Sequence, residues 1–200
     1  MSVLLFGGTL PRVDLAEASR YMRTPREIPE VTSLLREVER EVMPLVSLRL
    51  CYRRMEIKHT ETGIEIGTFP LDSRDLARRL ANCREVFLLA ATAGVALDRY
   101  IARQGALSPA RALAAQAIGT ERTEALCDAF CKEMNTTLAA EHARLTPRFS
   151  PGYGDLSLDA QRALFALLSP EKHVGVTLTD TLLMSPTKSV TAIVGIEVMK

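Results

Sequence analysis

The sequence contains no tryptophan, few aromatic residues and only three histidines, and these scarcities exclude several kinds of chemistry. His59, His142 and His173 do not have the H-x-x-x-H or H-E-x-x-H spacing of a zinc hydrolase. A G-x-S-x-G nucleophile elbow, a Walker phosphate loop and a Rossmann glycine motif are also missing. We therefore expect no catalytic residue and no metal site, although such a protein can still bind a reactive cofactor that supplies the chemistry.

Neither sign of charge is in excess, and no apolar stretch is long. Lysine and arginine number 25 against 24 acidic residues, so nothing in the net charge of +1 favours a nucleic acid or an anionic membrane. No uncharged run approaches the roughly 18 residues that cross a bilayer. The first twelve residues lack the basic start and long apolar stretch of a secretory signal. We expect no membrane partner.

Cysteine is scarce, and no C-x-x-C pair occurs. Cys127 and Cys131 are one helical turn apart, but no suitably spaced histidine or further cysteine completes a metal site. We therefore expect Cys51, Cys83, Cys127 and Cys131 to be buried free thiols, which fits a reducing cytoplasm.

Alanine and leucine fill the interior in place of aromatic residues, which favours helices. Apolar residues make up 47% and charged residues 24%, as in ordinary globular proteins. A chain of 200 residues fits one domain. We expect a single domain over 1–200, with a helical N-terminal part, 1–45, and a sheet-containing body, 46–200.

The spacing of apolar residues predicts helices and strands in irregular order. The expected helices cover 12–23, 31–43, 73–82, 95–104, 108–145, 158–168 and 169–175. The expected strands cover 46–58, 63–69, 85–92, 179–186 and 188–198, with the first two and the last two forming hairpins. Without regular β-α-β alternation, this order predicts an α+β fold with an antiparallel or mixed sheet and flanking helices.

A bend rich in proline and glycine follows the longest expected helix. Pro151 fixes a backbone torsion there, whereas Gly152 and Gly154 allow unusual torsions and close approach of a ligand. Arg148 adds a planar cation that suits a carboxylate or phosphate, and Tyr153 adds an aromatic face. This composition suggests the floor of a pocket for a small, partly anionic, partly aromatic ligand. Alternatively, Arg148 is a cation at a helix C-terminus and the bend is a plain loop.

The segment from Arg148 to Tyr153 reads R-x-x-x-G-Y and resembles the S-adenosylmethionine-binding motif of the activation domain of cobalamin-dependent methionine synthase. A second segment, EKHVGVTLTDTLLMSPTKSV, resembles that domain's K-H-T-G-x-x-L-T-E-S-x-x-M-x-P-x-x-S-V stretch. The residues in register are Lys172, His173, Gly175, Leu178, Thr179, Met184, Pro186, Ser189 and Val190. Two motifs in the right order and spacing make the resemblance strong. Residues 71–145 resemble this family more loosely, and the first seventy residues show little resemblance to it.

The resemblance implies a twisted antiparallel sheet flanked by helices, with a shallow site for S-adenosylmethionine. In that family, S-adenosylmethionine donates a methyl group to cobalamin whose cobalt has become oxidised, and a flavodoxin or similar reductant supplies an electron. The reduced cobalt is the nucleophile, so the protein needs no general base and acts by positioning and docking.

The resemblance also implies a role for each residue of the motif. Arg148 would hold the ligand's carboxylate, and Ser150 and Pro151 would shape the loop. Gly152 would allow close approach, and Tyr153 would face the adenosine. The family has an acidic residue six positions before the motif arginine; this chain has His142 there, with Glu141 beside it as the candidate.

The sequence lacks a D-x-H-x-x-G cobalamin motif and modules for homocysteine or folate. The resemblance therefore implies a standalone cytoplasmic reactivation subunit, not a complete enzyme by itself, whose cobalamin is carried by a separate methionine synthase polypeptide. The family continues past the second motif with a further aromatic, so we expect either weak ligand affinity or a partner that completes the site. The alternatives are a docking module for a corrinoid protein that has lost ligand binding, and a methyltransferase for another acceptor, which the missing Rossmann motif disfavours.

Overall fold

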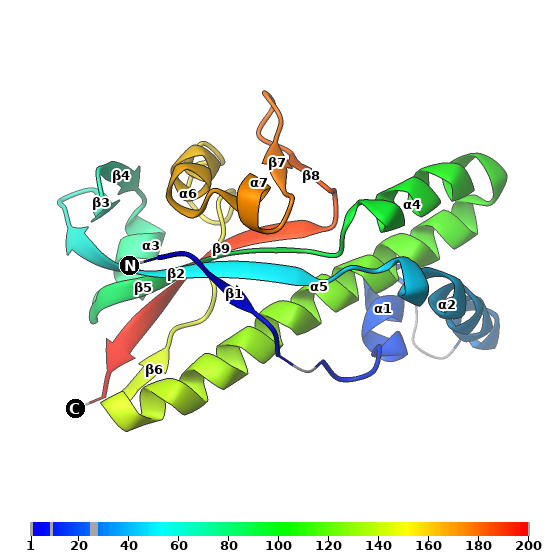
Figure 1. The fold of residues 1–200 in the computed structure, drawn as a ribbon, viewed down its shortest axis with the longest axis horizontal. Coiled ribbons are helices and arrows are strands. Elements are labelled where there is room, and N and C mark those ends of the chain that lie inside the picture. Colours follow the sequence, from blue (N-terminus) through cyan, green and yellow to red (C-terminus); the bar gives the residue numbers. More distant parts are fainter. Residues whose placement is uncertain (1, 9, 25–27, 200) are drawn as a thin grey trace.

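A long twisted sheet runs through the protein, with helices on both of its faces (Figure 1). The structure is a computed structural model that describes residues 2–8, 10–24 and 28–199. The strand order is β4-β3-β2-β5-β9-β6, and β1 pairs with β2 beside β3. Every pairing in this sheet is antiparallel, so the predicted α+β fold is confirmed in its antiparallel form.

The strands differ widely in length, and the three longest form the centre of the sheet. Their bounds are β1 Leu4–Phe6, β2 Arg49–His59, β3 Gly63–Ile66, β4 Phe69–Asp72, β5 Cys83–Thr92, β6 Ala143–Leu145 and β9 Ser189–Val198. A separate two-stranded sheet consists of β7 Thr177–Leu178 and β8 Met184–Ser185.

The helices include one of 30 residues, α5, which is more than twice as long as most others. Their bounds are α1 Leu15–Tyr21, α2 Pro29–Val42, α3 Arg74–Arg79, α4 Val95–Leu107, α5 Pro109–Leu138, α6 Ala160–Leu168 and α7 Pro170–His173. Two 3-10 turns cover Met43–Leu45 and Ala139–Glu141. None of the helices in the described ranges is both long and apolar enough to span a bilayer.

The apolar run of β5 is buried on both faces, as its sequence predicts. Alternate residues point to opposite faces, so Leu88 packs toward α3 and α6 while Leu89 packs toward α5. The first core includes Leu164 of α6, and the second includes Phe130 of α5. The sheet is therefore the middle layer between two apolar cores.

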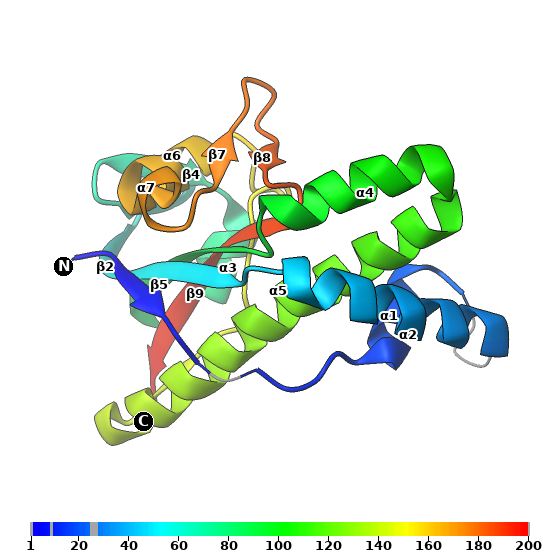
Figure 2. The same cartoon turned by 45° about the vertical axis from the view of Figure 1, so that its right-hand side comes forward.

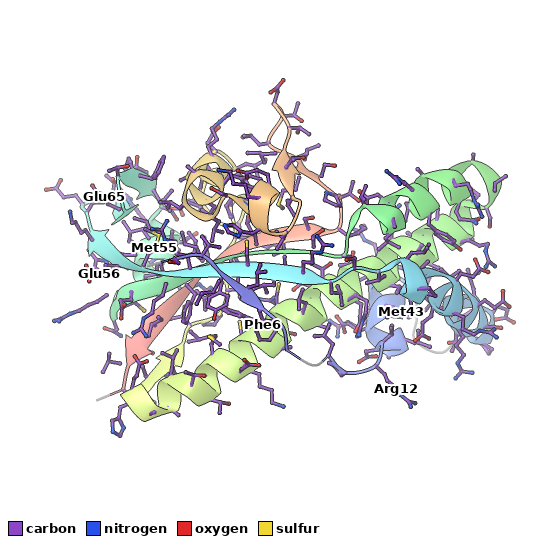
Figure 3. All side chains as sticks on the ribbon, in the orientation of Figure 1. Phe6, Arg12, Met43, Met55, Glu56 and Glu65 are labelled. Carbon is purple, nitrogen blue, oxygen red and sulfur yellow. The ribbon has the colours of Figure 1, made fainter. Side chains whose placement is uncertain are left out.

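The predicted helical N-terminal part also contains a strand that the sequence reading missed. Leu4 to Phe6 pair with Tyr52 to Leu50 of β2. Phe6 is the last residue of β1 (Figure 3). Its ring meets that of Phe130 of α5 edge-on, with centroids 5.5 Å apart. A run of three residues carries too little periodicity to be recognised, and contact with α5 stabilises it here.

The helices α1, α2 and α4 pack around the N-terminal half of α5 and form a third core (Figure 2). Leu35 and Val38 of α2 and Leu97 of α4 are fully buried there against Ile118 of α5. The C-terminal half of α5 covers the sheet instead. The middle of α5 therefore lies where the helical layer meets the sheet.

Three of the expected elements are wrong in part. The strand expected over 63–69 is divided by a turn into β3 and β4, which pair with each other. The final hairpin does not form, because β8 pairs with β7 whereas β9 pairs with β5 and β6. Between β7 and β8 the chain makes a tight turn in which Thr179 N–H donates to Leu183 O over 2.9 Å. The helix expected over 108–145 ends at Leu138, and His142 then takes a left-handed conformation that redirects the chain into β6. The hairpin of β2 and β3 is confirmed.

Candidate functional site

The segment that carries the R-x-x-x-G-Y motif leaves the edge of the sheet beside β9. Thr146 N–H donates to Gly195 O over 2.9 Å, and Phe149 exchanges backbone hydrogen bonds of 2.9 and 2.8 Å with Ile193. Phe149 is buried in the core on the α3 and α6 side. Because neighbouring residues of an extended segment point to opposite faces, Arg148 is directed toward α5.

Arg148 is held by two carboxylates of α5. Its Nη2 donates to Oε2 of Glu124 over 2.8 Å and to Oδ1 of Asp128 over 2.9 Å. These acids are four residues apart in α5 and so lie on the same face of the helix. The Arg148 side chain is only 22% exposed, and its buried Nη1 has no hydrogen-bond partner within the described residues. The guanidinium is therefore fixed and largely neutralised.

The loop after Arg148 has a compact backbone. Tyr153 N–H donates to Ser150 O over 3.2 Å, and Gly152 N–H donates to Leu156 O over 2.8 Å. Gly152 has a φ of +87°, a region that side chains with a Cβ resist. The turn leaves the Tyr153 side chain on the surface, with 69% of the residue exposed.

Asp155 ties the end of this loop to the N-terminus of α3. Its carboxylate accepts hydrogen bonds from Ser73 Oγ, from Arg74 N–H over 2.9 Å and from Asp75 N–H over 3.2 Å. The hydrogen bond from Ser73 and those from the helix N–H groups lower the pKa of Asp155. Ser73 caps α3 as predicted, since its Oγ accepts from Leu76 N–H over 3.0 Å.

Two cavities flank the loop, and both include Glu124, Ser150, Tyr153 and Val190 in their walls. The larger, of about 430 Å³, continues toward β8 and β9 and is also lined by Pro151, Leu158, Gln161, Leu182, Leu183, Met184, Thr187, Ser189 and Thr191. The smaller, of about 340 Å³, continues toward α3 and is also lined by Arg79, Arg148, Phe149 and Gly154. Both volumes fall in the range of about 300–1,000 Å³ that is usual for small-molecule sites.

The structure brings most of the predicted site residues together. Arg148, Ser150, Pro151 and Tyr153 line one or both cavities, and Gly152 shapes the turn between them.

Glu141 lines neither of the two cavities beside the loop. Its carboxylate accepts from Nη1 and Nη2 of Arg54 over 3.2 and 2.9 Å, beside a different cavity of about 830 Å³. The left-handed turn at His142 and the pairing of β6 with β9 separate Glu141 from the loop. The position of Glu141 in the sequence, seven residues before Arg148, did not reveal this separation.

Several site residues were missed by sequence reasoning. Glu124 belongs to α5, Arg79 belongs to α3, and neither is near the motif in sequence. Only the pairing of distant segments brings them to the loop, so no local spacing could have identified them. Of the second motif, Met184, Ser189 and Val190 line the larger cavity, while Lys172 and His173 lie on α7 and line neither.

The cysteines are free thiols, as expected, and three of the four are fully buried. Burial raises the pKa of Cys51 and Cys83 to about 11 and that of Cys127 to about 12. Within the ranges that the structure describes, no three His, Cys, Asp or Glu side chains are grouped so that they could hold a metal ion. The site therefore consists of a charged pair, a glycine turn and an exposed aromatic ring.

Comparisons with known proteins agree with this arrangement. Residues 112–197 match the family model of the vitamin B12 dependent methionine synthase activation domain. The fold resembles the crystal structure of the MetH reactivation domain bound to AdoHcy, with a TM-score of 0.64 and 15% sequence identity, over 98% of this chain and 78% of that one. No curated protein sequence matches the chain. The predicted resemblance is thus confirmed: residues 112–197 match the methionine synthase activation-domain family, and the chain has the fold of a methionine synthase reactivation domain.

Proposed function

We propose that this protein binds S-adenosylmethionine along the Arg148–Tyr153 loop and supports reductive methylation of cobalamin in a methionine synthase. The observation that carries the proposal is the pair of cavities on either side of the loop, which share Glu124, Ser150 and Tyr153. The similar reactivation domain was crystallised with AdoHcy, the demethylated form of S-adenosylmethionine. That relationship supports a ligand of the same class here.

The chemistry of the walls fits the two ends of this ligand. Glu124 faces both cavities and would attract the positive charge of the sulfonium or ammonium group. Tyr153 offers an exposed ring on which an adenine could stack. Gly152 would let the ligand approach the backbone closely. The amino-acid end would occupy the smaller cavity, which contains the charged groups Arg79, Glu124 and Arg148.

The protein's part in the reaction is to bind and orient. S-adenosylmethionine would supply the methyl group and leave as AdoHcy, and a cobalamin carried by a separate methionine synthase polypeptide would accept the methyl. A reductant such as a flavodoxin would supply the electron, and we place the reaction in the cytoplasm. This chemistry needs no general base, and the loop contains no histidine. The catalytic benefit would come from holding the sulfonium methyl toward the partner in a fixed geometry.

Calorimetric titration with S-adenosylmethionine tests the proposal. Wild-type protein should bind it, and Tyr153→Ala should bind it more weakly because the stacking surface is lost. Leu107→Ala is the matched control, since Leu107 is 70% exposed on α4 and lines neither cavity. Absence of binding by the wild type, with and without a cobalamin-carrying methionine synthase, contradicts the proposed function.

A second candidate function is a docking module that binds a corrinoid protein without any ligand. Apolar side chains around the larger cavity favour it, because Tyr153 and Leu183 are 69% and 64% exposed at its rim. Capture of a cobalamin-carrying methionine synthase that is independent of S-adenosylmethionine, combined with no binding of the nucleoside, would favour this function. Capture that strengthens with S-adenosylmethionine would favour the first.

A further inference from the structure

The larger cavity contains a buried amide whose donor is unused. Gln161 of α6 is only 4% exposed and lines this cavity. Its Oε1 accepts a hydrogen bond of 2.8 Å from Oγ1 of Thr191, which is itself buried on β9. Its Nε2 makes no hydrogen bond within the described residues and is not closed off from solvent. The free N–H groups of this amide therefore open into the cavity, where a bound ligand can supply their acceptor.

Two elements of the fold hold Gln161 in place. It lies in the first turn of α6, where its backbone N–H donates to Leu158 O over 3.0 Å. Its side chain is tied to Thr191, which pairs with Ala90 of β5 in the centre of the sheet. The amide is therefore ordered before a ligand arrives, so little side-chain entropy remains to be lost when it forms a further hydrogen bond.

The walls of the larger cavity suit a flat, uncharged ring. Most of its side chains are apolar or carry hydroxyl groups, and Glu124 is the one charged residue among the described residues that line it. The smaller cavity also contains Arg79 and Arg148, so it suits the zwitterionic amino-acid end of the ligand. An apolar pocket in which a few polar groups fix the orientation is typical of a small-molecule site. The adenine therefore fits the larger cavity, beside the free donor of Gln161.

We propose that Nε2 of Gln161 donates a hydrogen bond to a ring nitrogen of the ligand's adenine and thereby selects this base. This inference rests on the proposed function and assigns the residue that recognises the base. Adenine presents acceptor nitrogens in the plane of its ring, and glutamine amides bind such a nitrogen in protein–DNA complexes. A ring without the acceptor would leave Nε2 covered and unpaired, which is unfavourable.

The test uses AdoHcy and three of its analogues, in which N1, N3 or N7 of the adenine is replaced by C–H. Dissociation constants are measured by calorimetry for the wild type, Gln161→Met, Gln161→Glu and the control Gln104→Met. Gln161→Met keeps the length of the side chain and Gln161→Glu keeps an oxygen that can accept from Thr191, but both lack the amide donor. The control removes a glutamine of α4 that is 7% exposed and lines neither cavity.

We expect both Gln161 variants to bind AdoHcy about tenfold more weakly than the wild type does, as for the loss of one hydrogen bond. One analogue should show the same loss with the wild type and no further loss with either variant, because the two changes remove the same bond. Gln104→Met should bind all four ligands like the wild type.

Other outcomes overturn the inference in recognisable ways. If the Gln161 variants bind AdoHcy as tightly as the wild type, or if they weaken binding of AdoHcy and of all three analogues by the same factor, Gln161 does not contact a ring nitrogen. Wild-type protein that binds AdoHcy and all three analogues equally leads to the same conclusion. Wild-type protein that binds neither AdoHcy nor S-adenosylmethionine, with or without a cobalamin-carrying methionine synthase, contradicts the proposed function itself. Thermal melts establish that each variant is folded before binding is measured.

Discussion

Nη2 of Arg148 and Oε2 of Glu124 are 2.8 Å apart, so the cation of the motif and a carboxylate of α5 form one charged group beside both cavities. Glu124 is 34% exposed, whereas its companion Asp128 is 72% exposed and lines neither cavity. Of the two acids that hold Arg148, only Glu124 is therefore placed to meet a ligand.

The exchange Glu124→Gln should weaken binding of S-adenosylmethionine by about tenfold, because the carboxylate that faces its positive charge is replaced by a neutral amide. The control is Asp128→Asn, which also removes a charge from Arg148 but lies outside the cavities. Calorimetric titration measures both. Equal affinities for the two variants would show that Glu124 acts only through Arg148.

The carboxylate of Asp155 should make stability depend on pH. Hydrogen bonds, first from Ser73 Oγ and then from the N–H groups at the start of α3, lower the pKa of Asp155 in the folded protein. A lowered pKa in the folded protein contributes to its stability at pH values above about 3.9, the ordinary pKa of an aspartate. This contribution is lost as the pH falls through the pKa of the folded state.

Asp155→Asn should therefore be less stable than the wild type at neutral pH, and the difference should shrink in acid. Urea denaturation at neutral and at acidic pH measures it. Asp180→Asn is the control, because the exposed Asp180 makes no side-chain hydrogen bond or salt bridge within the described residues. A difference between Asp155→Asn and wild type that stays constant with pH would contradict the role of the charge.

Much of this fold follows from local sequence, because its strongest signals come from continuous segments. The apolar run of β5, the alternation in β2 and the Ser73 cap each depend on neighbours in sequence, and all three are present. The glycine turn at Gly152 was also visible, since its backbone torsion favours glycine whatever surrounds it.

The parts that escaped prediction depend on contacts between distant segments. Glu124 and Arg79 reach the loop from two different helices, and nothing in their own neighbourhoods distinguishes them from ordinary surface charges. The residues 179–183 alternate weakly like a strand, yet hydrogen bonds between Thr179 and Leu183 close them into a turn. The distance of Glu141 from the loop escaped prediction for the same reason, because the turn at His142 cannot be recognised from spacing.

Gly152→Ala should destabilise the folded protein by about 1–2 kcal/mol, the cost of placing a Cβ in left-handed backbone. There is space for the methyl group, since its nearest neighbour would be Leu158 Cδ1 at 3.5 Å, so the cost would come from the φ of +87°. The matched exchange Gly105→Ala, in α4 with open space around it, should instead stabilise by up to about 1 kcal/mol. Chemical denaturation of both variants measures the contrast, and equal effects would contradict it.

The buried pair of Glu121 and Arg122 should be the most sensitive charged group in the helical layer. Their side chains are only 5% and 2% exposed, and Arg122 Nη2 lies 2.5 Å from Glu121 Oε1. Arg122 also donates to Pro11 O over 2.7 Å and to Arg12 O over 3.1 Å, which fixes the segment before α1 against α5.

Arg122→Met should reduce the free energy of unfolding by about 3–5 kcal/mol, because Glu121 would remain buried without its counter-ion. The double variant Glu121→Leu/Arg122→Met removes both charges and should recover much of that loss, although the contacts to the N-terminal segment stay broken. Arg20→Ala is the control: its pair with Glu17 is 56% and 29% exposed, so removing it should cost about 1 kcal/mol or less. Urea denaturation of the four proteins separates the cases. If the double variant is as unstable as Arg122→Met, the loss comes from the broken contacts to Pro11 and Arg12, and the unpaired carboxylate is not its cause.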